Sequence, residues 1–221
     1  MTRRGGAQII PRPARSWVRP FNPWSRLDTS VLADTARVVE RLRVACAANR
    51  PLPPSPDAQV AAVLVGLVDG PDGPEVVLTR RSAGMRSHAG EIAFPGGRLD
   101  ADETVVDAAL REAREEIGLD PSSVEVLGEL GAITTHISTS HVVPVAALVR
   151  SRPRMDVVNA EVDRVLVVPL HELVRDDTYV EERWGTPPEQ FQIHFFFLDD
   201  ETVWGATGRI LYQVLSAAIS R

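Results

Sequence analysis

The apolar residues of this chain repeat with two different spacings, one typical of helices and one typical of strands. Helical spacing occurs in residues 31–46, 102–117 and 208–220. Short continuous or alternating apolar runs predict strands at residues 60–68, 75–79, 91–94, 124–133, 142–149, 165–168 and 190–198. Most of these strands are arranged to form hairpins rather than regular βαβ repeats. The expected fold is therefore an α/β sandwich with a mixed β-sheet.

A proline cluster at residues 49–56 marks the predicted domain boundary. Residues 1–56 are predicted to form a Pro/Arg-rich arm followed by a helix, and residues 57–221 to form the main domain. The arm carries Trp17, Phe21 and Trp24 among its prolines, which is too much aromatic surface for a solvated tail. We expect the arm to pack on its own domain or on a second subunit, so a homodimer stays open.

Composition narrows the functional classes. A chain of 221 residues with 44% hydrophobic content can bury one enzyme-sized core plus an appendage. Its net charge of -6 argues against nucleic acid as a partner, because phosphate-backbone binders usually have a basic surplus. No apolar run approaches the ~20 residues that span a bilayer, and the single cysteine, Cys46, cannot form an intrachain disulfide. We expect a cytoplasmic enzyme that acts on a small molecule, without a membrane partner.

The predicted helix at residues 102–117 has two contrasting sides. An apolar stripe is expected to face the core, formed by Val106, Leu110, Ala113 and Ile117. Three glutamates gather on the other side: Glu112, Glu115 and Glu116. Like charges at i,i+3 and i,i+4 repel, so nearby cations would stabilise them. Mg²⁺ or Mn²⁺ is suited to carboxylate oxygens, whereas the alternative interpretation is a solvated acidic face.

The residues before this helix indicate a close approach to a ligand. Gly96 and Gly97 follow a predicted strand and allow a tight backbone bend. Glu103 lies nine residues before Glu112, close to half a helical turn away from the glutamate cluster. We therefore expect Glu103 to have a structural role, either pairing with Arg111 or helping to cap the helix.

The residues from Gly97 to Leu119 resemble the Nudix box without a gap. The matching positions are Gly97, Glu103, Arg111, Glu112, Ala113, Glu115, Glu116, Gly118 and Leu119. The resemblance implies a Nudix α/β/α sandwich over the main domain and hydrolysis of a nucleoside diphosphate linked to another group. It also implies that Glu112 and Glu116, with Glu115, hold the metal. Metal ions neutralise phosphate oxygens and acidify a bound water, and a carboxylate can deprotonate that water. The glutamate cluster is our candidate base, and Glu161 is a competing candidate.

The loop that leads into the box is similar to that of the coenzyme A pyrophosphatase subgroup. The matching residues are Arg81, Ser82, Arg86, Gly90, Phe94, Pro95, Gly96 and Gly97, while Val77 replaces a leucine of the pattern. Residues 203–208 also resemble a stretch near the end of this subgroup. Arginine presents a planar fork suited to phosphate oxygens, so Arg81 and Arg86 are expected to bind substrate, together with Gly96 and Gly97. His88 is expected to be a structural hydrogen-bonding residue.

The resemblance implies cleavage of coenzyme A, or of its thioesters, to 3′,5′-ADP and 4′-phosphopantetheine. The first alternative is a Nudix hydrolase that acts on ADP-ribose, NADH, a dinucleotide or a deoxynucleoside triphosphate. The second is a non-enzymatic Nudix module that binds a nucleotide for regulation. Such a module would be expected to have lost residues of the box, and here the box is complete.

Overall fold

A mixed β-sheet forms the centre of the computed structural model, which describes residues 5–19, 21–51, 53–85, 87–134, 140–151 and 159–220. The main path through the sheet has the order β4-β3-β2-β8-β6, with β5 and β7 paired to β2 and β8, and β9 paired to β3. Their bounds are β2 Gln59–Gly70, β3 Gly73–Arg81, β4 Ile92–Ala93, β5 Gly96–Arg98, β6 Val124–Glu129, β7 Ile133–Thr134, β8 Ser140–Val149 and β9 Val162–Pro169. Strands β2 and β8 run parallel, and the other pairs are antiparallel.

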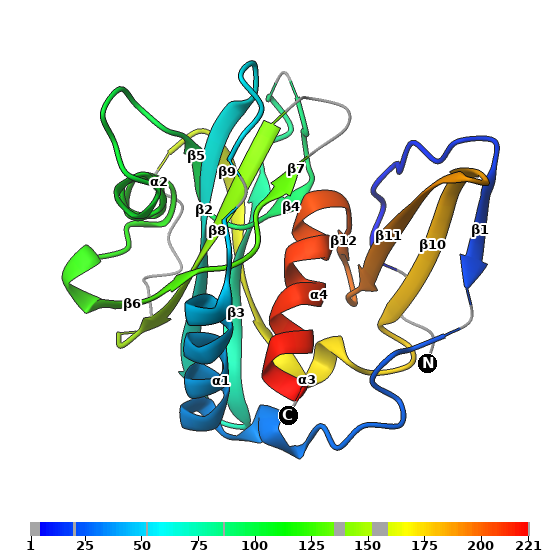
Figure 1. Ribbon diagram of the computed structural model, residues 1–221, viewed down its shortest axis with the longest axis horizontal. Helices are drawn as coiled ribbons and strands as arrows, with labels where there is room; N and C mark the ends of the chain where they lie inside the picture. Colours follow the sequence, from blue (N-terminus) through cyan, green and yellow to red (C-terminus); the bar gives the residue numbers. More distant parts are fainter. Residues whose placement is uncertain are drawn as a thin grey trace.

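Helices cover both faces of this sheet, as Figure 1 shows. Helix α2 (Val105–Ile117) lies on one face, and α1 (Thr35–Ala48) and α4 (Gly205–Ile219) lie on the other. Successive residues of β2 therefore enter different cores: Leu64 packs with α2, and Val65 packs with α1 and α4. A strand that is buried on both faces has no polar side, which explains the continuous apolar run along β2. The expected α/β/α sandwich with a mixed sheet is confirmed.

A second, antiparallel sheet lies beyond α4 and was not predicted as a layer. Its order is β1-β10-β11-β12, with bounds β1 Ser16–Arg19, β10 Tyr179–Thr186, β11 Glu189–Phe197 and β12 Thr202–Val203. The strand β1 comes from the N-terminal arm. Just after it, Trp24 is buried, with its ring centroid 4.7 Å from that of Tyr179 and 5.5 Å from that of Tyr212. The arm thus packs on its own domain, which was one of the two alternatives.

Several predicted element bounds were wrong. Helix α2 begins at Val105 rather than at 102, because Asp102 has a left-handed φ of 64° and Thr104 caps the helix. The single strand expected at 124–133 is two strands, β6 and β7, and α4 begins at Gly205 rather than at 208. The helix expected at 31–46 is divided into η1 Ser30–Ala33 and α1, and two short helical segments were missed: η2 Pro121–Ser123 and α3 Leu170–Leu173.

The segments on either side of the proline cluster share one core. Buried residues of α1 and Trp24 belong to the same cluster as buried residues of β2, β3 and α4. The boundary after residue 56 stays a prediction about domain organisation. No helix within the described ranges is long and apolar enough to span a membrane.

Candidate active site

Helix α2 is held by strong signals at both ends. At its start, the Thr104 hydroxyl accepts a hydrogen bond from the backbone N–H of Asp107 (3.1 Å). At its end, Gly118 adopts a left-handed φ of 64°, and its N–H donates to the carbonyl of Arg114 (3.0 Å). Glycine adopts this conformation without the penalty that a Cβ would impose.

The face of α2 that enters the core differs from the predicted stripe. Ala113 and Ile117 are buried as expected, whereas Val106 and Leu110 are only partly buried. Ala108 and Ala109 are buried instead and belong, with Ala113, to the core cluster that includes β2 residues. Because alanine side chains are small, the helix can approach the sheet closely there. This rotation of the buried face brings one of the glutamates into the interior.

That glutamate is Glu116, which is only 3% exposed although it was predicted to lie on the side of the helix away from the apolar stripe. Its Oε2 atom accepts a hydrogen bond from the backbone N–H of Gly96 (3.3 Å). Burial raises the pKa of the Glu116 carboxyl to about 7, and the neighbouring charges of Glu112 and Glu161 also raise it, while the Gly96 N–H and Arg81 oppose the increase. In the metal-free site, Glu116 can therefore exchange a proton near neutral pH.

The glycines of β5 make this close packing possible. A Cβ on Gly97 would collide with the carboxylate of Glu112, and a Cβ on Gly96 would collide with the backbone of β2 at Ala62 and Val63. Any larger residue at 97 would therefore displace Glu112. The structure brings Gly96 and Gly97 together with the glutamates of α2, as the order of these residues along the chain suggested.

Arg111 connects the acidic side chains around the start of the helix. Its guanidinium forms a bidentate ion pair with Glu103, with Nε to Oε1 at 2.9 Å and Nη2 to Oε2 at 3.0 Å. The same group donates to Glu112 Oε1 (2.9 Å) and lies 3.5 Å from Glu115 Oε2. The hydrogen bond from Arg111 lowers the pKa of Glu103. The predicted pairing of Glu103 with Arg111 is confirmed, and Thr104 rather than Glu103 caps the helix.

Arg81 lies at the end of β3, where the pairing with β9 shifts register. Its backbone closes the following loop: its N–H donates to Glu91 O (2.9 Å), and its carbonyl accepts from Gly90 N–H (3.0 Å). The buried Nε of Arg81 has no hydrogen-bond partner in the described part of the chain, and its charge lowers the pKa of Glu116. Arg81 thus brings positive charge to the buried carboxylate. The second predicted arginine, Arg86, lies outside the described residues.

Two other candidates flank the site. His88 Nδ1 lies 2.9 Å from Glu91 Oε2, which is the structural hydrogen bonding expected for this histidine. Glu161 is exposed, its carbonyl accepts from Ser82 N–H (2.7 Å), and its charge contributes to the raised pKa of Glu116. Glu161 therefore lies within electrostatic reach of the site and stays a candidate base beside the glutamates of α2.

The donor atoms fit a hard divalent cation. Glu112, Glu115 and Glu116 supply carboxylate oxygens, which Mg²⁺ and Mn²⁺ prefer. A cation would also offset the cost of burying the Glu116 carboxylate. Within the described ranges, however, no three acidic, histidine or cysteine side chains gather closely enough to hold a metal ion. Glu112 hydrogen-bonds to Arg111, so its side chain would have to turn away from that arginine to join a metal.

Comparison with known proteins identifies relatives of this chain. The family model described as NUDIX domain matches residues 58–189, which is more than half of the chain. The chain is 36% identical over 155 residues to NudL of Pectobacterium atrosepticum, named as an uncharacterized Nudix hydrolase; the match covers 70% of this chain and 80% of NudL. It is 35% identical to Nudix hydrolase 3 of Caenorhabditis elegans, with 70% of this chain and 71% of that protein covered.

A relative in Arabidopsis thaliana is named Nudix hydrolase 15, mitochondrial. It is 34% identical to this chain, with 77% of this chain and 64% of that protein covered. Among solved structures, the Nudix hydrolase RenU from M. smegmatis matches with a TM-score of 0.45 and 27% identity, covering 52% of this chain and 73% of that one.

Proposed function

Because the chain belongs to the Nudix family, we propose that it cleaves the pyrophosphate of coenzyme A, or of its thioesters, to yield 3′,5′-ADP and 4′-phosphopantetheine. As a Nudix hydrolase, it acts on phosphoric anhydrides. The observation that carries the proposal is the buried Glu116, held against Gly96 and faced by the charge of Arg81. An acid and an arginine gathered beside a glycine backbone suit a phosphate-containing substrate.

Each of these residues has a defined role in the proposed reaction. Glu112, Glu115 and Glu116 would hold Mg²⁺ or Mn²⁺. When bound, such a metal neutralises phosphate oxygens and acidifies a water molecule. One carboxylate of the site, either from the glutamate cluster of α2 or from the competing Glu161, accepts the proton of the attacking water.

The substrate is bound by groups at the edge of β5 and β3. Arg81 at the end of β3, and Arg86 five residues later in the sequence, bind phosphate oxygens through their guanidinium forks. Gly96 and Gly97 are the proposed backbone contacts of the pyrophosphate. Because the Glu112 carboxylate occupies the space beside Gly97, this side chain would turn away as the substrate enters. Because a substrate with a ribose 3′-phosphate adds a further anionic group, two arginines close together in the sequence favour coenzyme A over nucleotides that lack this phosphate.

The cellular setting forms part of the proposal. We infer a cytoplasmic enzyme with a small-molecule substrate and no nucleic acid partner. A homodimer stays a prediction, since the arm packs on its own domain.

A substrate comparison tests the proposal. Turnover with Mg²⁺ is measured for coenzyme A, 3′-dephospho-coenzyme A, ADP-ribose, NADH and dGTP. We expect the highest kcat/KM for coenzyme A, and a reduction by roughly 10-fold or more when the 3′-phosphate is absent, which corresponds to the loss of about 1.4 kcal/mol of binding. Equal or better turnover of ADP-ribose, NADH or dGTP would contradict coenzyme A as the substrate but not the assignment of the protein as a Nudix hydrolase.

Two variants test the residue roles within the same assay. Glu116→Gln keeps the size of the side chain but removes the charge, and it should abolish metal-dependent turnover. Arg81→Gln should mainly raise KM for coenzyme A. The exposed Arg37→Gln serves as a charge-matched control, because Arg37 lies on α1, on the opposite face of the sheet from α2. Full activity of Glu116→Gln with Mg²⁺ would place the catalytic carboxylates elsewhere.

A further inference from the structure

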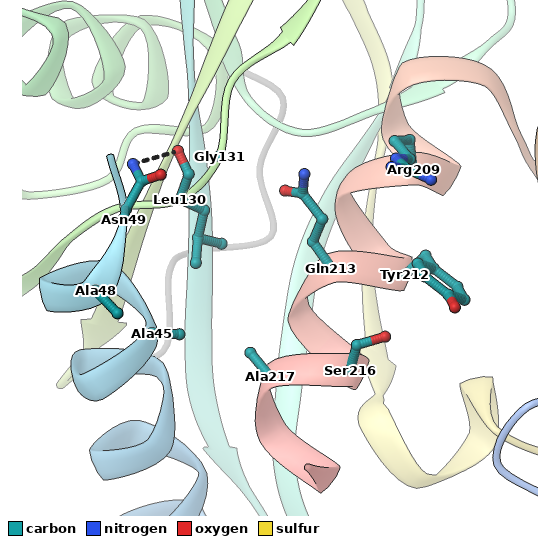
Figure 2. A pocket seen from close by; sticks show the side chains of 10 residues that line it. All are labelled: Ala45, Ala48, Asn49, Leu130, Gly131, Arg209, Tyr212, Gln213, Ser216 and Ala217. Carbon is teal, nitrogen blue, oxygen red and sulfur yellow. Dashed lines mark hydrogen bonds between the residues drawn. The ribbon is translucent and has the colours of Figure 1, made fainter. Parts of the chain in front are cut away.

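A pocket of about 330 Å³ lies between α1, α4 and the segment that joins β6 to β7. Figure 2 shows Ala45 of α1 pointing toward α4, and Gln213 and Ala217 of α4 pointing toward α1. Its walls are mainly apolar, with Ala45 on α1, Ala217 on α4 and Leu130 between them. Such a volume is within the range of small-molecule sites, which begins at about 300 Å³. The pocket lies on the face of the sheet opposite to α2.

The walls of the pocket are connected by hydrogen bonds. The Asn49 side-chain nitrogen donates to the carbonyls of Glu129 and Leu130, each at 3.2 Å. Arg41 Nη1, on α1, donates to the carbonyls of Ala218 (2.7 Å) and Ile219 (3.0 Å) at the end of α4. These bonds hold α1, α4 and the β6–β7 segment together, so the space between them is a preformed feature.

The first polar group in the pocket is the Gln213 amide. Figure 2 shows its side chain extending from α4 into the space between the helices. Its Oε1 atom is buried and has no hydrogen-bond partner within the described ranges. Gly131 lies opposite, where an added Cβ would approach Gln213 Nε2 to 3.4 Å. A buried carbonyl oxygen without a donor is costly, and a ligand with an N–H group would satisfy it.

The second polar group is Arg209, one turn before Gln213 on α4. Among the described residues it makes no ion pair with a carboxylate. Its Nη1 lies 3.3 Å from Nε2 of His194, a fully buried ring that stacks on Tyr212 at a centroid distance of 4.0 Å. Since arginine is only a donor, His194 Nε2 is the acceptor, and the proton on Nδ1 is donated to the Tyr179 hydroxyl (2.8 Å). A neutral ring thus orients Arg209 without neutralising its charge.

We propose that this pocket binds a nucleoside phosphate. The edge of a nucleobase places an N–H donor beside an acceptor, which matches the Oε1 and Nε2 atoms of the Gln213 amide. A phosphate group matches the unneutralised guanidinium of Arg209, and the apolar walls contact the base. An apolar ligand would leave both polar groups unsatisfied, and a free phosphate would leave Gln213 and the walls unused. The inference does not depend on the proposed reaction.

Isothermal titration calorimetry of the full chain in EDTA tests this site. EDTA prevents metal-dependent binding at the glutamates of α2. The probes are 3′,5′-ADP, adenosine and inorganic phosphate. We expect 3′,5′-ADP to bind more tightly than either of the other two, because it alone engages both polar groups. Arg209→Gln and Gln213→Leu should each weaken 3′,5′-ADP binding by about 10-fold. Arg37→Gln on α1 removes the same charge outside the pocket and should change binding by less than about 2-fold.

The remaining outcomes separate this inference from the proposed reaction. Unchanged affinity in both pocket variants, no binding of 3′,5′-ADP, equal binding of free phosphate, or an equal loss in Arg37→Gln would each overturn the inference. Circular dichroism and thermal unfolding establish that each variant is folded before titration. Binding that depends on Arg209 and Gln213 in a protein that does not cleave coenzyme A would leave the pocket standing and remove the proposed function. Turnover of coenzyme A by a protein that does not bind 3′,5′-ADP in this pocket would leave the proposed function standing and overturn the pocket inference.

Discussion

Replacing Glu116 by glutamine should stabilise the metal-free protein at neutral and alkaline pH but not at pH 4.5 or below. Burial raises the pKa of Glu116 from 4.5 to about 7. Below pH 4.5 the carboxyl is protonated in both the folded and unfolded states and costs nothing. As the pH rises from 4.5 to 7, the unfolded chain releases its proton while the folded protein retains it, so the free energy of unfolding decreases. Above pH 7 the buried carboxylate exerts its full cost.

The magnitude follows from the size of the pKa change. One pKa unit corresponds to about 1.4 kcal/mol, so a change from 4.5 to about 7 amounts to roughly 3 kcal/mol of lost stability above pH 7. Glutamine has nearly the same shape and can still accept the hydrogen bond from Gly96 N–H, but it cannot ionise. The Glu116→Gln variant should therefore be more stable than the wild type by about 3 kcal/mol at pH 8, and about equally stable at pH 4.5 or below.

Urea unfolding in EDTA at pH 4.5 and pH 8 measures this difference. Glu115→Gln is the matched control, because the side chain of Glu115 is 55% exposed and its charge loses little hydration on folding. Saturating Mg²⁺ should reverse the result at pH 8, since a cation bound to the glutamates stabilises the wild type more than the variant. The reasoning would be refuted by a Glu116→Gln variant that gains no stability at pH 8, or by a gain of the same size at both pH values.

Three further predictions concern the packing around the site and the core. Ile117→Ala should lower the free energy of unfolding by roughly 2–5 kcal/mol, because Ile117 is only 1% exposed, and urea titration should show a smaller loss for the partly buried Leu110→Ala. Gly97→Ala should reduce turnover by at least about 10-fold, since the added methyl group displaces the Glu112 carboxylate, with thermal unfolding close to that of the wild type; normal kinetics would show that Glu112 need not occupy this position. Burial lowers the pKa of His194 from 6.5 to about 3. As the pH falls through 6.5, His194 therefore gains a proton in the unfolded state but not in the folded state, which lowers the free energy of unfolding by about 2 kcal/mol at pH 5. His194→Gln should therefore lose less stability than the wild type between pH 7 and pH 5, and parallel pH profiles in urea unfolding would contradict this account.

Local signals in the sequence were sufficient to predict helix α2 and its immediate partners. Gly118 ends the helix through its left-handed backbone conformation, whereas the Thr104 side-chain cap at its start was not predicted. The spacing of Glu103 and Arg111 brings their side chains together at the start of the helix. The unbroken apolar run of β2 likewise predicted a strand. These features depend on interactions between residues close in sequence, or on burial of a whole segment, so a linear pattern records them.

The second sheet could not be predicted in this way. Strand β10 contains Glu181 and Glu182, which give it a polar pattern, yet both are buried. Arg12 of the arm donates from Nε to both carboxylate oxygens of Glu182, and Arg183 and Arg19 pair with Glu181. Carboxylates are tolerated in the interior only with such partners. Because Arg12 and Arg19 lie far away in sequence, only the tertiary structure reveals that this strand can be buried.

The glutamates of α2 show the same division within the site itself. The periodicity of the sequence placed Glu112, Glu115 and Glu116 together on one side of a helix, and the resemblance to the Nudix box implied that they bind a metal. The sequence pattern could not show which glutamate is buried. Burial depends on a second segment, β5, whose residues Gly96 and Gly97 pack closely against α2 and cover Glu116. A helical pattern records how one helix divides its own surface into polar and apolar sides. Hydration, and with it the pKa of each carboxyl, is decided by whatever part of the chain packs against that surface.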